Sequence, residues 1–223
     1  MRKRVTILSM IIFLLAVYVL PSNMIYSMKQ DIFMIDKVIV LDPGHGGIDD
    51  GACENQLYED ILNLEIATYI YELFFNSGAQ VYITRTGDYD LASLYAKNRK
   101  KEDLFKRTNF INNIQPDVLI SIHMNAFGNT KVNGSQVFFY QDDLLARCVQ
   151  EELNKLNKKD KKIKKDDYYI LEKTHCHSVL VECGFLTGGE DSLKLQDKKY
   201  KKELAKSIYN GVTIFFDNFN LNN

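Results

Sequence analysis

Residues 37–47 read KVIVLDPGHGG, and this stretch decides the fold and places the first candidate for chemistry. Residues 37–42 contain four consecutive apolar side chains and are followed by Pro43 and Gly44. A continuous apolar run of this length, bounded by turn residues, predicts a β-strand that is buried on both faces. His45 comes next, so we expect an imidazole at the carboxyl end of a central strand.

The rest of the chain alternates short apolar runs with longer stretches of helical periodicity. Strands are predicted where apolar residues run together, and helices where they recur every three or four positions. Such alternation is typical of an α/β domain built around a largely parallel sheet. The predicted strands are residues 37–42, 80–84, 117–122, 135–140, 168–171 and 178–183, and the predicted helices are residues 61–75, 91–113, 143–157 and 200–218.

Length and charge narrow the class of protein. A chain of 223 residues suits one domain with a full hydrophobic core. Its formal net charge of −1 gives no electrostatic basis for a nucleic-acid partner. Residues 155–165 are rich in lysine, but they include Asp160 and precede two further aspartates, so we interpret them as a solvated loop.

The amino-terminal segment differs in composition from the rest. Three basic residues at positions 2–4 precede an uncharged run over residues 5–20. A basic head with an apolar stretch of this length indicates a signal peptide or membrane anchor over residues 1–22. Because no A-x-A cleavage site follows, we expect an uncleaved anchor rather than a secreted protein. Residues 23–36 then form a linker, and the folded domain at residues 37–218 lies outside the cytoplasmic membrane.

Four polar residues stand where the predicted strands end or the first long helix starts. His45 and His123 follow the first and third strands in chain order. Glu182 lies at the end of the last strand, and Glu59 precedes the first helix. If the strands are parallel, these side chains meet at the carboxyl edge of the sheet, where open α/β sheets form their sites. Two imidazoles and a carboxylate suit catalytic zinc, and a further carboxylate can accept a proton from water.

Each of these residues also has a structural interpretation. A single histidine after a strand is more often a capping or core residue than a ligand. Glu59 fits an ordinary first-turn acid that is favoured by the helix dipole. Glu182 is harder to explain in this way, because burying an unpaired carboxylate is costly. The spacing alone therefore leaves the metal site and the structural roles open.

A second candidate metal group is the run His175-Cys176-His177, with Cys183 close behind it. Its two imidazoles share one face if the segment is extended, but a His-x-His spacing is a weak signal. Cys176 and Cys183 could also form disulfides, because export permits them. The four cysteines of the chain allow three pairings. A chain of this size needs no disulfide staples, so we expect free thiols.

An ordered series of motifs runs from residue 37 to residue 217. It consists of VIVLDPGHGG at 38–47, Glu59 with Asn63-Leu64, Thr84-Arg85, Arg107, Asn112, SIHMNA at 121–126, Gly134, and VLVECGFL at 179–186. Taken in this order, the series resembles the zinc-dependent N-acetylmuramoyl-L-alanine amidases of the cell-separation and spore-cortex type. Any single motif is moderately specific for this family, and the presence of all of them in this order is much more specific.

The resemblance implies a fold, a metal site and a reaction. The fold is a sheet of about six strands with helices on both faces. The ligands of one Zn²⁺ per chain would be His45, Glu59 and His123, with Glu182 as the catalytic base. The reaction is hydrolysis, by zinc-activated water, of the amide between N-acetylmuramic acid and L-alanine in peptidoglycan. A lone domain behind an anchor is similar to the spore-cortex amidases, which implies a role in muramic-δ-lactam formation, cortex maturation and germination.

Other positions matched by the resemblance have less certain roles. Arg85 could pair with a peptide carboxylate or have a structural role, and Asn125 could orient a ligand or the substrate. Arg107 fits a helix salt bridge equally well. The chain departs from the family pattern at His177, where many relatives have proline, and at Cys183, where an apolar residue is usual. These departures leave the number of bound metal ions open.

Two other functions fit the same residues. One is a membrane-anchored zinc peptidase that cuts within the stem peptide. The other is a tethered module that binds the wall or a partner without catalysis. An activating protein partner that orders the metal site is compatible with each of these functions and with the amidase.

Overall fold

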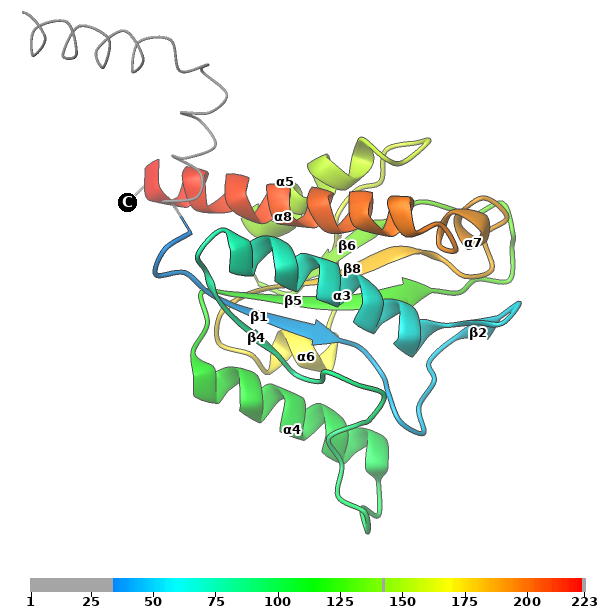
Figure 1. The fold of residues 1–223 in the computed structure, drawn as a ribbon, viewed down its shortest axis with the longest axis horizontal. Helices are drawn as coiled ribbons and strands as arrows, with labels where there is room; N and C mark the ends of the chain where they lie inside the picture. Colours follow the sequence, from blue (N-terminus) through cyan, green and yellow to red (C-terminus); the bar gives the residue numbers. More distant parts are fainter. Residues whose placement is uncertain (1–33, 142, 222–223) are drawn as a thin grey trace, which may run out of the picture.

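The structure is a computed structural model, and it describes residues 34–141 and 143–221 (Figure 1). The predicted leader at residues 1–22 lies outside this part, as does nearly all of the predicted linker. The last linker residues, 34–36, form a turn in which Met34 is buried in the core. Among the described helices, none is both long and apolar enough to cross a membrane.

Six strands form the central sheet, in the order β4-β1-β5-β8-β6-β7. The pairs β4–β1, β1–β5 and β5–β8 are parallel, β6 is antiparallel to β8, and β7 is parallel to β6. The largely parallel sheet of about six strands expected from the sequence is therefore confirmed. The strands are Val38–Pro43 (β1), Gln80–Ile83 (β4), Val118–Asn125 (β5), Gln136–Phe139 (β6), Lys164–Lys165 (β7) and His177–Phe185 (β8).

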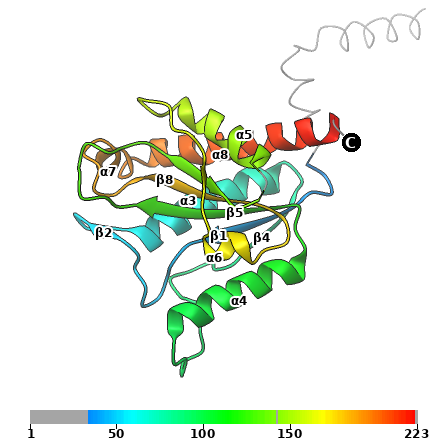
Figure 2. The ribbon, with the colours of Figure 1, turned by 180° about the vertical axis from the view of Figure 1, so that it is seen from behind.

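Helices cover both faces of this sheet, as the two opposite views in Figures 1 and 2 show. Helices α3, α5 and α8 pack on one face, and α4 and α6 pack on the other. A two-stranded hairpin, β2 and β3, leads directly into α3. The remaining bounds are Cys53–Glu54 (β2), Leu57–Tyr58 (β3), Glu59–Asn76 (α3), Arg99–Ile114 (α4), Leu144–Asn154 (α5), Tyr169–Glu172 (α6), Asp191–Lys194 (α7) and Lys198–Leu221 (α8).

Side chains of the central strands alternate between two hydrophobic cores. Ile39 and Leu41 of β1 pack beneath α3, α5 and α8, whereas Val40 packs beneath α4 and α6 together with Leu119 and Leu180. On this second face each strand changes from apolar to polar toward its carboxyl end. The polar residues there are Asp42 on β1, Ser121 and His123 on β5, and Glu182 on β8. The alternation thus aims all of these side chains at one side of one sheet edge.

The prediction of a strand at residues 168–171 is wrong. These residues enter the short helix α6, because a four-residue apolar run fits a buried helical turn as well as a strand. The edge position of the sheet is taken instead by β7, which lies within the segment interpreted as a solvated loop. Both residues of β7 are exposed lysines, and charged residues on an edge strand discourage pairing with another chain.

The predicted start of the helix at residue 91 is also wrong. Helix α4 begins at Arg99, because the side chain of Asn98 caps it. Its Oδ1 accepts a hydrogen bond from the backbone N–H of Lys101 at 3.1 Å. Asparagine is a strongly preferred N-cap residue, and it fixes the helix boundary here.

The four cysteines are all free thiols, as expected. Cys148 and Cys183 are buried, and Cys53 is exposed. Cys183 belongs to the core beneath α3 and α8, so its side chain points away from the face that carries Glu182.

Candidate functional site

The loop after β1 holds His45 in an unusual backbone conformation. Its φ angle is +61°, in the left-handed region that few residues other than glycine adopt and that often occurs at functional sites. Gly44, directly before it, packs against the ring of His123, so a Cβ at Gly44 would lie 2.1 Å from Cε1 of that ring. The glycine therefore allows the two imidazole rings to approach, with their centroids 5.0 Å apart.

Glu59 is the first residue of α3, and backbone groups hold its carboxylate. Oε1 accepts the N–H of Met124 at 3.1 Å, and Oε2 accepts the N–H of Ala52 at 2.8 Å. The side chain is buried. Glu59 is thus a first-turn acid of α3, as in the structural interpretation, but its buried side chain is turned toward the sheet edge.

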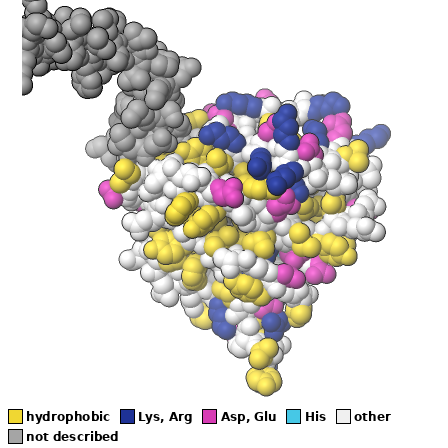
Figure 3. Space-filling model, in the orientation of Figure 1, with side chains coloured by type: hydrophobic (Ala, Val, Ile, Leu, Met, Phe, Trp, Pro, Cys, Tyr) yellow, Lys and Arg dark blue, Asp and Glu magenta, His cyan; other side chains and the backbone are white. Residues whose placement is uncertain are grey.

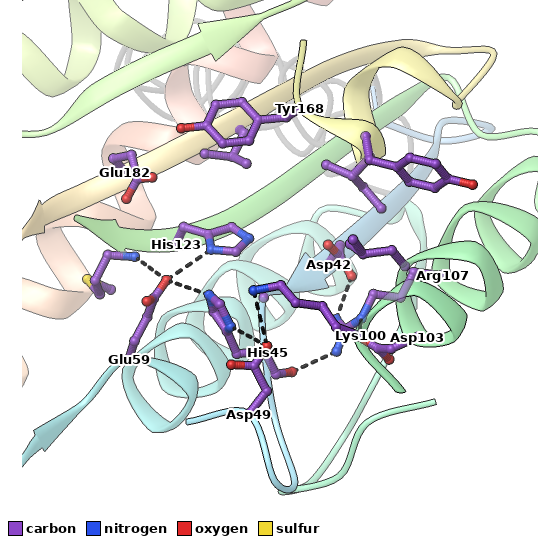
Figure 4. A pocket seen from close by; sticks show the side chains of 16 residues that line it. Asp42, His45, Asp49, Glu59, Lys100, Asp103, Arg107, His123, Tyr168 and Glu182 are labelled. Carbon is purple, nitrogen blue, oxygen red and sulfur yellow. Dashed lines mark hydrogen bonds and ion pairs between the residues drawn. The ribbon is translucent and has the colours of Figure 1, made fainter. Parts of the chain in front are cut away.

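The three candidate ligands converge on one point (Figure 4). Oε1 of Glu59 lies 2.9 Å from Nδ1 of His123 and 3.2 Å from Nε2 of His45. One potential ligand atom from each residue lies within 4.8 Å of the other two. Among the residues described by the structure, this is the one group of histidine, cysteine and acidic side chains close enough to share a metal ion.

Asp49 fixes the orientation of the His45 ring. Its Oδ2 lies 3.0 Å from Nδ1 of His45, which leaves Nε2 turned toward Glu59. A carboxylate on the far nitrogen of a histidine selects the tautomer and makes the near nitrogen a better metal ligand. Sequence reasoning missed Asp49, although an acid four residues after a histidine in a glycine-rich loop was a visible signal.

The charges of the group influence one another. Burial raises the pKa of Glu59, but hydrogen bonds and positive charge from His123 and His45 outweigh it and hold this pKa far below its usual range. Burial lowers the pKa of His45, yet Glu59 and Asp49 together raise it above its ordinary value. A carboxylate and two nitrogen donors are therefore held together in a partly desolvated place, which favours a cation.

Glu182 lies beside the group and is not part of it. Glu182 and His123 are register partners in the parallel pair of β5 and β8, so their side chains share one face. The carboxylate is 7% exposed, and its Oε2 has no hydrogen-bond partner within the described part of the chain. Burial raises the pKa of Glu182 from 4.5 to about 7, with the charges of His123 and His45 opposing the rise. Such an acid can accept and return a proton near neutral pH.

A buried ion pair supports the His45 loop from below. Nη1 of Arg107 lies 2.8 Å from Oδ1 of Asp42, and Nη2 of Arg107 donates to the carbonyl of His45 at 2.6 Å. The hydroxyls of Thr84 and Ser121 donate to the same aspartate at 2.7 and 2.9 Å. Strands β1 and β5, the end of β4 and helix α4 are thereby tied together directly beneath the candidate ligands.

Both arginines of the motif series have structural roles. Arg107 makes the predicted helix salt bridge, at 2.8 Å from Asp103. Arg85 is 1% exposed and donates four hydrogen bonds to backbone carbonyls, including those of Pro43 and Gly44. The buried guanidinium is engaged by these carbonyls, which favours the structural role for Arg85, and its contact with a substrate carboxylate stays a prediction.

A cavity of about 300 Å³ opens over the group. Glu182 and Tyr168 lie on one wall, and Lys100 lies across from them, 3.7 Å from Asp49 (Figure 4). Sequence reasoning missed Tyr168, because its segment was assigned to a strand, and Lys100, because an exposed lysine at a helix start carries no special signal. Asn125 does not line this cavity, and its proposed contact stays a prediction.

The second candidate metal group does not assemble. His177 packs against the rings of Phe215 and Phe219 at the amino end of β8, with centroids 5.0 and 5.2 Å away. Cys183 lies toward the other end of the strand and points into the core. Within the described residues, the segment 175–177 brings no three ligand atoms together. The departures from the family pattern at positions 177 and 183 therefore add no ligand to the site.

The residues of the group fit a zinc ion. Two imidazole nitrogens and one carboxylate oxygen are typical protein ligands of catalytic zinc sites, which leave a further position open. The buried, unpartnered Oε2 of Glu182 in the same cavity supplies an acceptor for a water molecule or a substrate atom. The site can thus combine a Lewis acid with a proton acceptor.

Comparison with known proteins gives a consistent result. A family model described as N-acetylmuramoyl-L-alanine amidase matches residues 39–214. The germination-specific N-acetylmuramoyl-L-alanine amidase of Bacillus subtilis is 36% identical over 189 residues, which is 81% of this chain and 80% of that protein.

Solved structures show the same similarity. The CwlD amidase of Clostridioides difficile, in complex with the GerS lipoprotein, superposes with a TM-score of 0.78 and 34% identity over 82% of this chain and 99% of that chain. An N-acetylmuramoyl-L-alanine amidase from Clostridium difficile 630 gives a TM-score of 0.72 and 31% identity over 81% of this chain and 97% of that one.

Proposed function

The chain belongs to the N-acetylmuramoyl-L-alanine amidase family, and we propose that it hydrolyses the amide between N-acetylmuramic acid and the L-alanine of the stem peptide. The observation that carries the proposal is the convergence of two imidazoles and a carboxylate beside a buried, unpartnered glutamate. The proposed zinc ligands are His45, Glu59 and His123, and the proposed base is Glu182.

Each residue has a definite task in this reaction. Zinc held by the three ligands would lower the pKa of a water toward about 7 and polarise the scissile carbonyl. Glu182 accepts the proton of the attacking water and returns it to the leaving amine of L-alanine. In the metal-free protein burial raises the pKa of Glu182 above its ordinary value, which favours its role as a proton acceptor and donor. Asp49 keeps the His45 ring in the tautomer that presents Nε2.

Digestion of purified peptidoglycan tests the reaction. We expect mass spectrometry to find glycan strands freed of L-alanine and intact released stem peptides, with activity lost to a chelator and restored by zinc. Stems shortened from within would identify the zinc peptidase instead. Absence of any released peptide from the zinc-loaded protein, with or without a partner, would identify a non-catalytic wall-binding module.

Loss of the Asp49 carboxylate should weaken metal binding. We expect Asp49→Ala to reduce zinc affinity by about 10- to 100-fold, because His45 loses the group that fixes its ring. Competition with a chromophoric chelator measures this affinity. Asp50→Ala is the matched control, since that residue is the exposed neighbour and contacts α3 through its carbonyl only. Equal affinities in the two variants would show that Asp49 does not support the ligand.

The biological setting of the reaction is a separate part of the proposal. The relative from Bacillus subtilis is named germination-specific, and CwlD was solved with a lipoprotein bound. These names support the part of the proposal in which the chain acts on spore cortex, outside the cytoplasm, with the help of a protein partner. The basic residues 2–4 and the uncharged run 5–20 support the part in which residues 1–22 anchor it. Tightly bound zinc in the isolated protein would argue against strict dependence on a partner. Release of the full chain into the soluble fraction would argue against the anchor.

A further inference from the structure

A second hollow, of about 550 Å³, lies away from the cavity over the proposed zinc ligands. It is bounded by the loop that precedes β6, the lysine-rich loop after α5, helix α7 and the start of α8. Five lysines line it, on a chain whose net charge is only −1. They come from three separate segments: Lys131, Lys158, Lys159, Lys161 and Lys194. Figure 3 shows Lys and Arg side chains, with Asp and Glu side chains among them, over the α8 side of the molecule.

The two acidic residues of this hollow neutralise only one of the five lysines. Glu190 forms an ion pair with Lys158 at 2.8 Å. Asp191 is buried, and its Oδ2 accepts the backbone N–H groups of Gly134 and Phe185 at 2.7 and 2.9 Å. Of the five lysines, the other four have no acidic side chain within ion-pair distance in the described part of the chain.

The loop that presents these lysines is held in a defined shape. The side chain of Asn154 binds both backbone groups of Lys161, at 2.9 and 3.0 Å. The side chain of Asn157 binds both backbone groups of Ser135, at 2.8 and 3.0 Å. Gly134 adopts a φ angle of +95°, and a Cβ there would lie 3.1 Å from Cε of Lys161. The hollow is therefore built by specific contacts, unlike a run of solvated charges.

Two of the ammonium groups are positioned by aromatic rings. Nζ of Lys161 lies 5.5 Å from the ring centroid of Phe185, and Nζ of Lys194 lies 5.5 Å from that of Tyr200. A cation–π contact restrains an ammonium group without cancelling its charge. Lys161 and Lys194 therefore remain available to an anion while their side chains are kept at the hollow.

We propose that this hollow binds the phosphate groups of an anionic polymer. Several positive charges around one concavity repel one another, and a bound polyanion relieves that repulsion. The lining supplies lysines and no arginine, and a lysine ammonium binds a phosphate group as a point charge. A concave site fits a chain of phosphates better than the flat surface of a membrane.

Binding of a fluorescently labelled linear polyphosphate to the full chain tests the proposal, by anisotropy at physiological ionic strength. The double variant Lys161→Gln/Lys194→Gln should bind at least about tenfold more weakly. The matched control is Lys165→Gln/Lys206→Gln, which removes two lysines that also lie over aromatic rings but outside the hollow. This control should stay within about twofold of the native protein. Both variants should keep native thermal unfolding and native cleavage of a soluble muropeptide.

Four outcomes would overturn the proposal. Equal weakening in the two double variants would show attraction to net charge alone, and no measurable binding by the native chain would show that the hollow is not a phosphate site. Polyglutamate of matched length binding as tightly as polyphosphate would refute the choice of phosphate. Tighter binding to vesicles of anionic phospholipid, lost in the same variant, would assign the surface to a membrane. Because binding is measured without turnover, none of these outcomes depends on the amidase reaction.

Discussion

Glu182→Gln is expected to lower the rate of peptide release by about 10²- to 10⁴-fold while zinc stays bound. Glutamine keeps the size and shape of the side chain but cannot accept a proton from water. Glu182 lies outside the group of candidate ligands, so metal content should not change. Release of stem peptide from purified muropeptides measures the rate, and elemental analysis measures the zinc.

The structure also predicts that this variant folds normally. In the metal-free protein burial raises the pKa of Glu182 from 4.5 to about 7. The free energy of unfolding therefore falls as the pH rises through this range, because the buried side chain must ionise. The neutral amide removes that cost, and unfolding at pH 8 should occur at a temperature no lower than that of the native protein. Glu172→Gln is the control, since this acid pairs with Lys173 and does not line the catalytic cavity. Nearly full activity in Glu182→Gln would exclude this residue as the base.

The sequence was sufficient to locate the candidate site because strand ends are visible in it. His45, His123 and Glu182 each interrupt or follow a run of apolar residues, and parallel strands deliver such residues to one edge. The structure adds that all three lie on the same face, which depends on register. A shift of β8 by one residue against β5 would turn Glu182 toward the other core, and no single-chain pattern excludes that shift.

What the sequence could not supply was the partner of each charged side chain. Arg85 looked available for a substrate because it follows a strand at the site edge, yet its donors satisfy carbonyls of the glycine-rich loop. Tyr168 lies on the same wall of the cavity as Glu182 because its segment turns into α6 and does not continue as a strand. Lysines in residues 155–165 line a hollow together with helix α7 and the start of α8, which are distant in sequence. Such pairings depend on tertiary contacts, and local periodicity does not record them.

Arg107→Met is expected to cost about 3–5 kcal/mol of unfolding free energy, the largest stability effect we predict. Arg107 neutralises Asp42 in a place where both side chains are buried, and its removal leaves an unpaired charge beneath the His45 loop. Burial raises the pKa of Asp42, but Arg107 and the hydroxyl of Thr84 outweigh it and lower this pKa. The contribution of the Asp42–Arg107 pair to the free energy of unfolding is therefore fully present above about pH 4. It is lost as the pH falls further. Urea denaturation of the metal-free protein at pH 7 measures the loss.

Arg147→Met separates this effect from the general loss of an arginine. Arg147 of α5 pairs at 3.0 Å with Asp143, the residue just before this helix, on the surface, and such pairs contribute at most about 1 kcal/mol. The double variant Arg107→Met/Asp42→Asn should recover part of the stability, because the buried charge is removed along with its partner. A cost for Arg107→Met no greater than that for Arg147→Met would mean that Asp42 does not depend on Arg107. The His45 loop would then be held mainly by Arg85, whose hydrogen bonds reach the carbonyls of Pro43 and Gly44 in that loop.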